Sequence, residues 1–150
     1  TADVPLQPGL CETMEMNDLS YTTHVPSVDE FIALRVSAGL SRNDPDAATA
    51  GLAGTCFSVC VRDDGRLVAM GRVIGDGGCF FQVVDVAVHP EYQRRGIGLQ
   101  VMTRLMEQLR EHAPKTAYVS LFADGNAARL YEKFGFERTT PASTGMALRL

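Results

Sequence analysis

The chain has 150 residues, of which 45% are hydrophobic and 21% charged, and its net charge at neutral pH is −4. This size fits one domain that can bury a core without disulfides or metals, and the composition excludes global disorder. A weakly acidic chain without a run of Lys and Arg is a poor nucleic-acid partner, and its apolar runs are too short to span a membrane. The same mild acidity would tolerate a cationic amine.

The N-terminal segment, residues 1–19, carries prolines and polar residues without periodicity. We expect it to be a flexible arm ahead of a single domain over residues 20–150. It has no basic stretch followed by an apolar one, so it does not resemble a secretory signal, and we expect a cytoplasmic location. The cysteines form no Cys-x-x-Cys pair and have no histidine at ligand spacing, which predicts free thiols and no metal. They are Cys11, Cys56, Cys60 and Cys79.

The domain is predicted to begin with a short strand and two capped helices. Residues 20–24 carry the β-branched and aromatic side chains that are typical of a strand. Ser27 and Glu30 form a capping box ahead of apolar residues at helical spacing. Asp44 and Pro45 fit the N-cap and the first position of a second, alanine-rich helix.

The sequence then changes to the alternation that is typical of strands. Residues 56–61 and 66–74 predict two strands that are joined into a hairpin by the turn at 63–65. A second turn at 75–78, rich in glycine, leads into a third antiparallel strand over residues 79–88. The first part of the sheet is therefore expected to be antiparallel.

The second half of the chain predicts a βαβ unit. Apolar residues recur at helical spacing between 98 and 112, and a strand follows at 117–122. Because a helix separates this strand from the preceding one, the two strands should be parallel. A short helix is expected over 126–134, and a terminal hairpin from 136–138 and 145–150. The predicted fold class is α/β, with a mixed α+β sheet and helices on both faces.

The most specific feature lies where the third strand passes into the long helix. Residues 93–98, Gln-Arg-Arg-Gly-Ile-Gly, follow the apolar run 83–88 and begin the helix. Glycines leave the backbone uncovered where the first N–H groups of a helix have no intrahelical acceptor, so these amides can bind a phosphate. The chain contains neither a P-loop motif nor the G-x-G-x-x-G of a dinucleotide-binding unit. A P-loop NTPase and a Rossmann dehydrogenase are therefore disfavoured.

The pattern Q-x-x-G-x-G after a strand resembles the signature of the GNAT superfamily of acyl-CoA N-acyltransferases. This resemblance implies a GNAT-like fold and a turn that binds the pyrophosphate of acetyl-CoA, which is a co-substrate, with no metal. It also implies that the pantetheine arm pairs with the preceding strand as an added strand. The residues expected to bind acetyl-CoA there are Val86, Ala87, Val88, Gln93, Arg94, Arg95, Gly96, Ile97, Gly98 and Leu99.

A second motif, residues 126–136, resembles the N-x-x-A-x-x-L-Y-x-x-x-G-F segment of the same superfamily, with Arg129 as a departure from it. By this resemblance Tyr131 is the general acid that protonates the departing thiolate, and Asn126 contacts the pantetheine arm. In an alternative interpretation Tyr131 is a core residue and Asn126 caps a helix.

One carboxylate, Asp85, interrupts the apolar third strand. An unpaired buried carboxylate is costly, which favours a functional role, and Asp85 is our candidate for the base that deprotonates the amine. Alternatively, Asp85 points to the face opposite Val84 and Val86 and anchors a loop or an arginine. Gln82 matches the position at which some relatives carry a basic glutamate, and a glutamine cannot act as a base.

The resemblance implies an enzyme, an N-acetyltransferase that moves an acetyl group to a primary amine by direct attack in a ternary complex. We expect the amine to be a small molecule, with neither nucleic acid nor membrane as a partner, and a homodimer among the oligomeric states to consider. Two alternatives stay open: a protein or peptide N-acetyltransferase, and a non-catalytic acyl-CoA-binding regulatory module.

Overall fold

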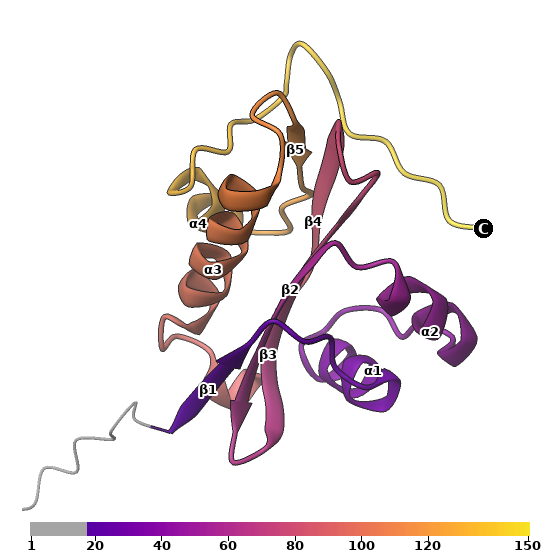
Figure 1. Ribbon diagram of the computed structural model, residues 1–150, viewed down its shortest axis with the longest axis vertical. Helices are drawn as coiled ribbons and strands as arrows, with labels where there is room; N and C mark the ends of the chain where they lie inside the picture. Colours follow the sequence, from indigo (N-terminus) through magenta and orange to yellow (C-terminus); the bar gives the residue numbers. More distant parts are fainter. Residues whose placement is uncertain (1–17) are drawn as a thin grey trace, which may run out of the picture.

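The computed structural model describes residues 18–150, and most of the predicted arm, residues 1–17, lies outside the described residues. The strands are β1 (Leu19–Thr22), β2 (Phe57–Asp63), β3 (Arg66–Gly75), β4 (Phe80–Val88) and β5 (Tyr118–Ser120). The helices are α1 (Val28–Ser37), α2 (Pro45–Ala53), α3 (Ile97–His112) and α4 (Ala128–Glu132), with a 3-10 turn, η1 (Pro90–Tyr92), ahead of α3. Figure 1 shows these elements in chain order.

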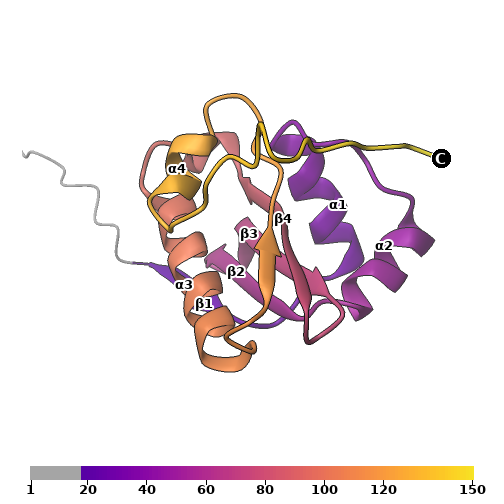
Figure 2. The same cartoon turned by 90° about the horizontal axis from the view of Figure 1, so that it is seen from above.

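A single mixed sheet organises the described residues, with its strands in the order β1-β2-β3-β4-β5. The first four strands are antiparallel to their neighbours, whereas β5 runs parallel to β4, as the crossover through α3 requires. Helices α1 and α2 cover one face of the sheet, and α3 and α4 cover the other (Figures 1 and 2). The predicted mixed α/β fold is confirmed.

Helices α1 and α2 begin at the capping residues that the sequence predicts. Ser27 accepts a hydrogen bond from the Glu30 amide, and the Glu30 carboxylate accepts from the Ser27 amide, so the capping box forms at α1. Asp44 caps α2, with Pro45 at its first position. Within the described residues, no helix is long and apolar enough to cross a membrane.

Two clusters of buried side chains hold the helices against the sheet. On the side of α3, the fully buried residues Val101 and Leu105 pack against β2 and β3. On the side of α1 and α2, Phe31 packs with Met70 of β3 and Ala87 of β4. Cys60 lies in this second cluster, and Cys56, Cys60 and Cys79 are free thiols, whereas Cys11 lies outside the described residues.

The end of the chain departs from the prediction. Helix α4 is shorter than the expected 126–134, and the expected terminal hairpin of 136–138 and 145–150 is wrong, because neither segment forms a strand. Its turn is present, since the Ser143 amide donates to the Thr139 carbonyl at 2.9 Å. The two arms were predicted from the alternation of apolar and polar residues. This alternation indicates an extended strand, but it does not indicate the strand with which it pairs.

Close approach of α3 to the sheet depends on Gly71 in β3. A Cβ atom added there would lie 2.7 Å from Val101 Cγ1 and 2.8 Å from Leu105 Cδ1. Both side chains are fully buried and have little room to move. We expect Gly71→Ala to lower the free energy of unfolding by about 1–3 kcal/mol, measured by urea denaturation.

Gly51 in α2 provides the matched control, because a Cβ atom there would meet nothing within 4 Å. Gly51→Ala should raise the free energy of unfolding by about 0.4–1 kcal/mol, since alanine is the better helix former. Equal stabilities of the two variants would contradict the close packing of α3 on β3.

Candidate active site

The N-terminus of α3 is open to an anion. Gly96 is its N-cap in the left-handed conformation, with φ of 77°, and supplies no side-chain hydrogen bond to the helix. The first turn has no acidic residue, so the amides of Ile97, Gly98 and Leu99 lack an internal partner at the positive end of a 16-residue helix. A Cβ atom at Gly96 would meet nothing within 4 Å, so the space around this N-cap is open. This is the geometry of a phosphate site.

The residues before Gly96 add charge and shape to this turn. Arg94 has φ of 63°, an uncommon conformation for a residue other than glycine, and both Arg94 and Arg95 are exposed. The Arg95 guanidinium lies 5.1 Å from the centre of the Tyr92 ring. Gln93 Nε2 donates to the carbonyl oxygen of Val88 at 3.0 Å, which joins the turn to the end of β4. The turn therefore carries two exposed arginines directly ahead of Gly96.

Strands β4 and β5 separate next to this turn. Their pairing ends at Gln82 opposite Ser120, so from there to its end β4 has no strand on that side among the described residues. The Val88 carbonyl points to this unpaired edge, because it accepts from the Gln93 side chain. Backbone groups of residues two apart share an edge, which places those of Val86 there as well. An extended ligand could pair with β4 at this edge.

A β-bulge bends β4 just where the edge is free. Met70 and Arg72 of β3 stand opposite Ala87 and Val84, so β4 has one extra residue over this interval. Asp85 lies in the bulge with φ of 55°. Ala87, by contrast, faces Met70 in the ladder and is buried, so its backbone is less available to a ligand than that of its neighbours.

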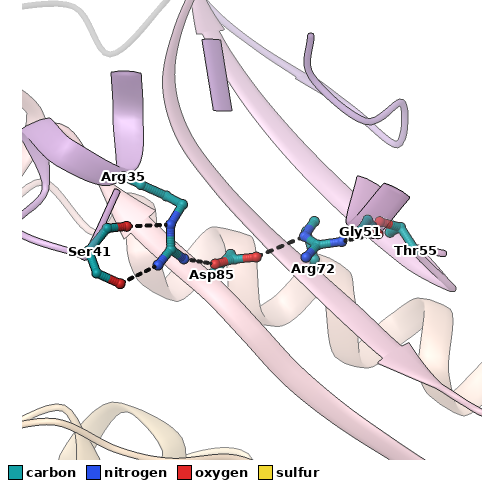
Figure 3. Close-up of polar contacts among 6 residues, drawn as sticks. All are labelled: Arg35, Ser41, Gly51, Thr55, Arg72 and Asp85. Atoms are coloured by element: carbon teal, nitrogen blue, oxygen red, sulfur yellow. Dashed lines mark hydrogen bonds and ion pairs between the residues drawn. The ribbon is translucent and has the colours of Figure 1, made fainter. Parts of the chain in front are cut away.

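Asp85 is held between two arginines (Figure 3). Its Oδ1 accepts from Nη1 of Arg35, near the end of α1, and its Oδ2 accepts from Nε of Arg72 in β3 at 2.9 Å. The side chains of Asp85, Arg35 and Arg72 are only 7%, 13% and 9% exposed. One carboxylate therefore joins α1, β3 and the bulge of β4 in a buried ion cluster.

Polar and aromatic neighbours stabilise both guanidinium groups of this cluster. Arg72 Nη1 donates to Thr55 Oγ1 at 2.6 Å and to the Gly51 carbonyl at 3.0 Å, in the last turn of α2, where the helix dipole favours a cation. Arg35 donates to the backbone and side chain of Ser41. Both guanidinium groups also lie over the Phe31 ring, 5.7 Å from its centre for Arg35 and 5.3 Å for Arg72.

This environment bears on the predicted role of Asp85 as a base. Both of its oxygens already accept from arginine, so accepting a proton would require breaking a contact in a buried cluster. The arrangement matches the alternative interpretation, in which Asp85 anchors an arginine. Sequence reasoning missed Arg35 and Arg72. The signal for Arg72 was a lone charge inside the apolar run of β3.

Tyr131 lies on the opposite side of the sheet from this cluster, among the residues packed with α3. Its side chain is nearly buried and meets the Phe136 ring edge-on. Burial, with a smaller contribution from Asp124, raises the pKa of the Tyr131 phenol above its usual value. The phenol therefore stays protonated at neutral pH and can act as a proton donor beside the hollow of about 390 Å³ that it lines.

Asn126 lies one turn ahead of Tyr131 but does not cap α4 with its side chain. The N-cap of α4 is Ala127, and no side-chain hydrogen bond caps this helix. The interpretation of Asn126 as a side-chain cap is therefore wrong. The start of α3 meets this region as well, because the Cα of Gly98 faces Leu130 of α4 and Val88 of β4. The start of α3 thus contacts both the end of β4 and α4.

Removing the Asp85 carboxylate should test how much the fold depends on the ion cluster. Asp85→Ala leaves two buried guanidinium groups without their counter-ion, and we expect the free energy of unfolding to fall by about 3–5 kcal/mol in chemical denaturation. Glu111→Ala, at an exposed site on α3, is the control and should change it by less than about 0.5 kcal/mol. A loss at Asp85 as small as that of the control would show that the cluster is not structural.

Comparison with known proteins places this geometry among acetyltransferases. The family model of an acetyltransferase (GNAT) domain matches residues 54–138. The crystal structure of a protein of unknown function from meticillin-resistant Staphylococcus aureus, named a probable acetyltransferase, is 42% identical. The match covers 88% of this chain and 99% of that one, with a TM-score of 0.84.

Two curated relatives match over a shorter region. The uncharacterized N-acetyltransferase ycf52 of Porphyra purpurea is 36% identical over 81 residues, which is 54% of this chain and 45% of that protein. The chloroplastic serotonin N-acetyltransferase 2 of Oryza sativa subsp. japonica is 37% identical over 83 residues, which is 55% of this chain and 40% of that protein. The chain therefore spans less than half the length of these two relatives.

Proposed function

Because this chain belongs to the GNAT family of acetyltransferases, we propose that it transfers an acetyl group from acetyl-CoA to a small primary amine, by direct attack in a ternary complex. The observation that carries this proposal is the open N-terminus of α3 next to the unpaired edge of β4. A phosphate site beside a free strand edge fits a ligand with a diphosphate and an extended amide-bearing arm.

The residues present fit the donor. The amides of Ile97, Gly98 and Leu99 would hold the diphosphate, with Arg94 and Arg95 adding positive charge. The backbone of Val86 and Val88 would pair with the amides of the pantetheine arm, and the Val88 carbonyl would exchange its Gln93 contact for this pairing. Bound there, acetyl-CoA supplies an activated thioester.

The chain then has two tasks in the reaction. A backbone amide at the bulge, near Val86, would stabilise the negative charge that develops on the acetyl oxygen when the neutral amine attacks. Tyr131, kept protonated by its raised pKa, would give its proton to the departing thiolate. The nitrogen of the tetrahedral adduct would release its extra proton to solvent, and Tyr131 would regain a proton from solvent. We assign Asp85 the role of a positioning residue that fixes the bulge. Because Asp85 is then not the base, the ammonium form of the substrate would lose its proton to solvent before it attacks.

One relative and the hollow beside Tyr131 support the proposal that the amine is a small molecule. The rice relative is named for an amine substrate, serotonin. The hollow lined by Tyr131 measures about 390 Å³, which lies in the range of small-molecule sites.

The phosphate site is tested by Gly96→Glu. The new carboxylate would stand in front of the open amides and oppose the diphosphate, so we expect the affinity for coenzyme A to fall at least about 100-fold in calorimetry. Gly39→Glu is the matched control, since Gly39 also has positive φ, at 85°, with nothing within 4 Å of its Cβ position, but follows α1. Equal affinities of the two folded variants for coenzyme A would show that its diphosphate does not bind at this turn.

The transfer itself is tested by following thiol release from acetyl-CoA with a panel of small amines and with peptides. We expect turnover with a small primary amine and a fall of about 100-fold in kcat for Tyr131→Phe, because the thiolate loses its proton donor. If coenzyme A binds but neither amines nor peptides release thiol, the chain is a binding module and not an enzyme. Turnover only with peptides would favour a protein acetyltransferase.

The pH profile of the same assay reports two steps, the loss of a proton by the amine and the donation of a proton by Tyr131. The rate should rise with pH as the amine, with an ordinary pKa near 10, becomes neutral. A raised pKa keeps Tyr131 protonated through pH 9, so no falling limb should occur below about pH 10. A decline between pH 7 and 9 would contradict Tyr131 as the acid.

A further inference from the structure

The end of the β2–β3 hairpin holds the segment that leads into the turn ahead of α3. Asp63 and Arg66 are the last facing pair of this hairpin, and Asp64 and Gly65 between them both have positive φ, at 45° and 81°. Two-residue turns with positive φ match the twist of the strands that they join, which fixes the positions of the flanking pair. Both members of this pair reach beyond the sheet to η1.

Tyr92, the last residue of η1, is bound to the hairpin through its phenol. The hydroxyl donates a hydrogen bond to Oδ2 of Asp63, 29 residues away in the sequence. This bond raises the pKa of the Tyr92 phenol, which therefore stays a donor at neutral pH. A hydrogen bond to a carboxylate is stronger than one between neutral groups. The half-buried ring also packs against the core cluster that includes α3.

Arg66 approaches the other end of η1. Its Nη2 lies 3.1 Å from Nε2 of His89, the residue that caps η1 by accepting from the Glu91 amide at 3.2 Å. Its contact with the Glu91 carboxylate, at 3.7 Å, is exposed and contributes little. The rings of His89 and Tyr92 meet edge to face, with their centres 6.1 Å apart. Both ends of η1 thus lie against the end of one hairpin.

The position of Tyr92 bears directly on the glycine turn, residues 93–96, which follows it. The Arg95 guanidinium lies over the Tyr92 ring, 5.1 Å from its centre. Between them, Arg94 has φ of 63°, a strained conformation that persists only when its surroundings fix it. The Tyr92 ring therefore supports the glycine turn from the side of the hairpin.

A second support of the glycine turn would be lost when coenzyme A binds. Gln93 donates to the Val88 carbonyl at 3.0 Å in this structure, and in the proposed function that carbonyl pairs with the pantetheine arm instead. The turn would then depend on Tyr92, and through it on Asp63, to keep the open amides of α3 facing the diphosphate.

We propose that Asp63 and Tyr92 are positioning residues for coenzyme A, because the hydrogen bond between them holds the glycine turn in the conformation that binds the diphosphate. This inference rests on the proposed function. Without the hydrogen bond, the turn occupies the binding conformation for only part of the time, and the apparent affinity falls by that fraction. The chemical step depends instead on the bulge of β4 and on Tyr131, so the loss is confined to binding.

Calorimetry with coenzyme A tests the proposal. Tyr92→Phe removes only the hydroxyl, and we expect the affinity to fall about 10-fold while kcat at saturating acetyl-CoA stays within about 2-fold. Asp63→Ala should have the same effect, and the double variant no larger one, because both changes remove the same hydrogen bond. Asp63→Asn keeps an acceptor oxygen and should recover most of the affinity. Tyr118→Phe, at an exposed tyrosine of β5, is the control and should bind as the wild type does.

Three results would overturn this inference. They are an unchanged affinity of Tyr92→Phe, losses that add in the double variant, and a fall in kcat as large as the loss of affinity. The last of these would indicate a general loss of structure, which the recovery by Asp63→Asn also tests.

Amide exchange in the ligand-free protein separates this inference from the proposed function. The Gln100 amide donates to the Gly96 carbonyl at 3.2 Å, so its exchange reports on the start of α3. By NMR we expect it to exchange about 10-fold faster in Tyr92→Phe, with the Leu105 amide in the middle of α3 unchanged. A wild-type chain that does not bind coenzyme A would contradict the proposed function. Equal exchange of Gln100 in the two chains, when the wild type does bind coenzyme A, would contradict this inference alone.

Discussion

The carboxylate of Asp85, held between Arg35 and Arg72, fixes the bend in β4 on which the candidate site depends. A bulge with a positive φ at an aspartate is strained, and it persists only when its surroundings fix it. Here the two arginines come from α1 and β3, so the bend cannot relax without breaking buried charged contacts. Because β4 bends, it parts from β5 after Gln82 and leaves its backbone free beside the turn that begins α3.

The position of that turn follows from packing on the other face of the sheet. Gly71 stands opposite the bulge and has no side chain, which lets Val101 and Leu105 bring α3 close to β3. The start of the helix then rests against Val88 through Gly98. The ion cluster on one face and the close packing on the other thus place the free strand edge and the open helix N-terminus side by side.

Local signals predicted much of this structure, and long-range pairing accounts for what they missed. The caps at Ser27 and Asp44 and the turn at Gly96 depend on residues within one turn of each other, so the sequence predicts them directly. The bulge at Asp85 depends on the register of β4 against β3, and the pairing of Asp85 with Arg72 follows only once that register is known. The apolar alternation in residues 145–150 predicted a strand, but no local pattern selects the edge on which a strand pairs.

The sheet also separates the charged cluster from the proposed proton donor. The cluster of one carboxylate and two guanidinium groups lies on the face of α1 and α2, and it sums to one positive charge. Tyr131 lies on the face of α3 and α4, where burial raises the pKa of its phenol. In the proposed reaction, the positive charge at the bend in β4 would disfavour an ammonium group there and favour the neutral amine, which is the form that can attack a thioester. Such selection of the neutral amine would require no carboxylate base at the reacting atoms, which fits a buried Asp85 that serves the backbone geometry alone.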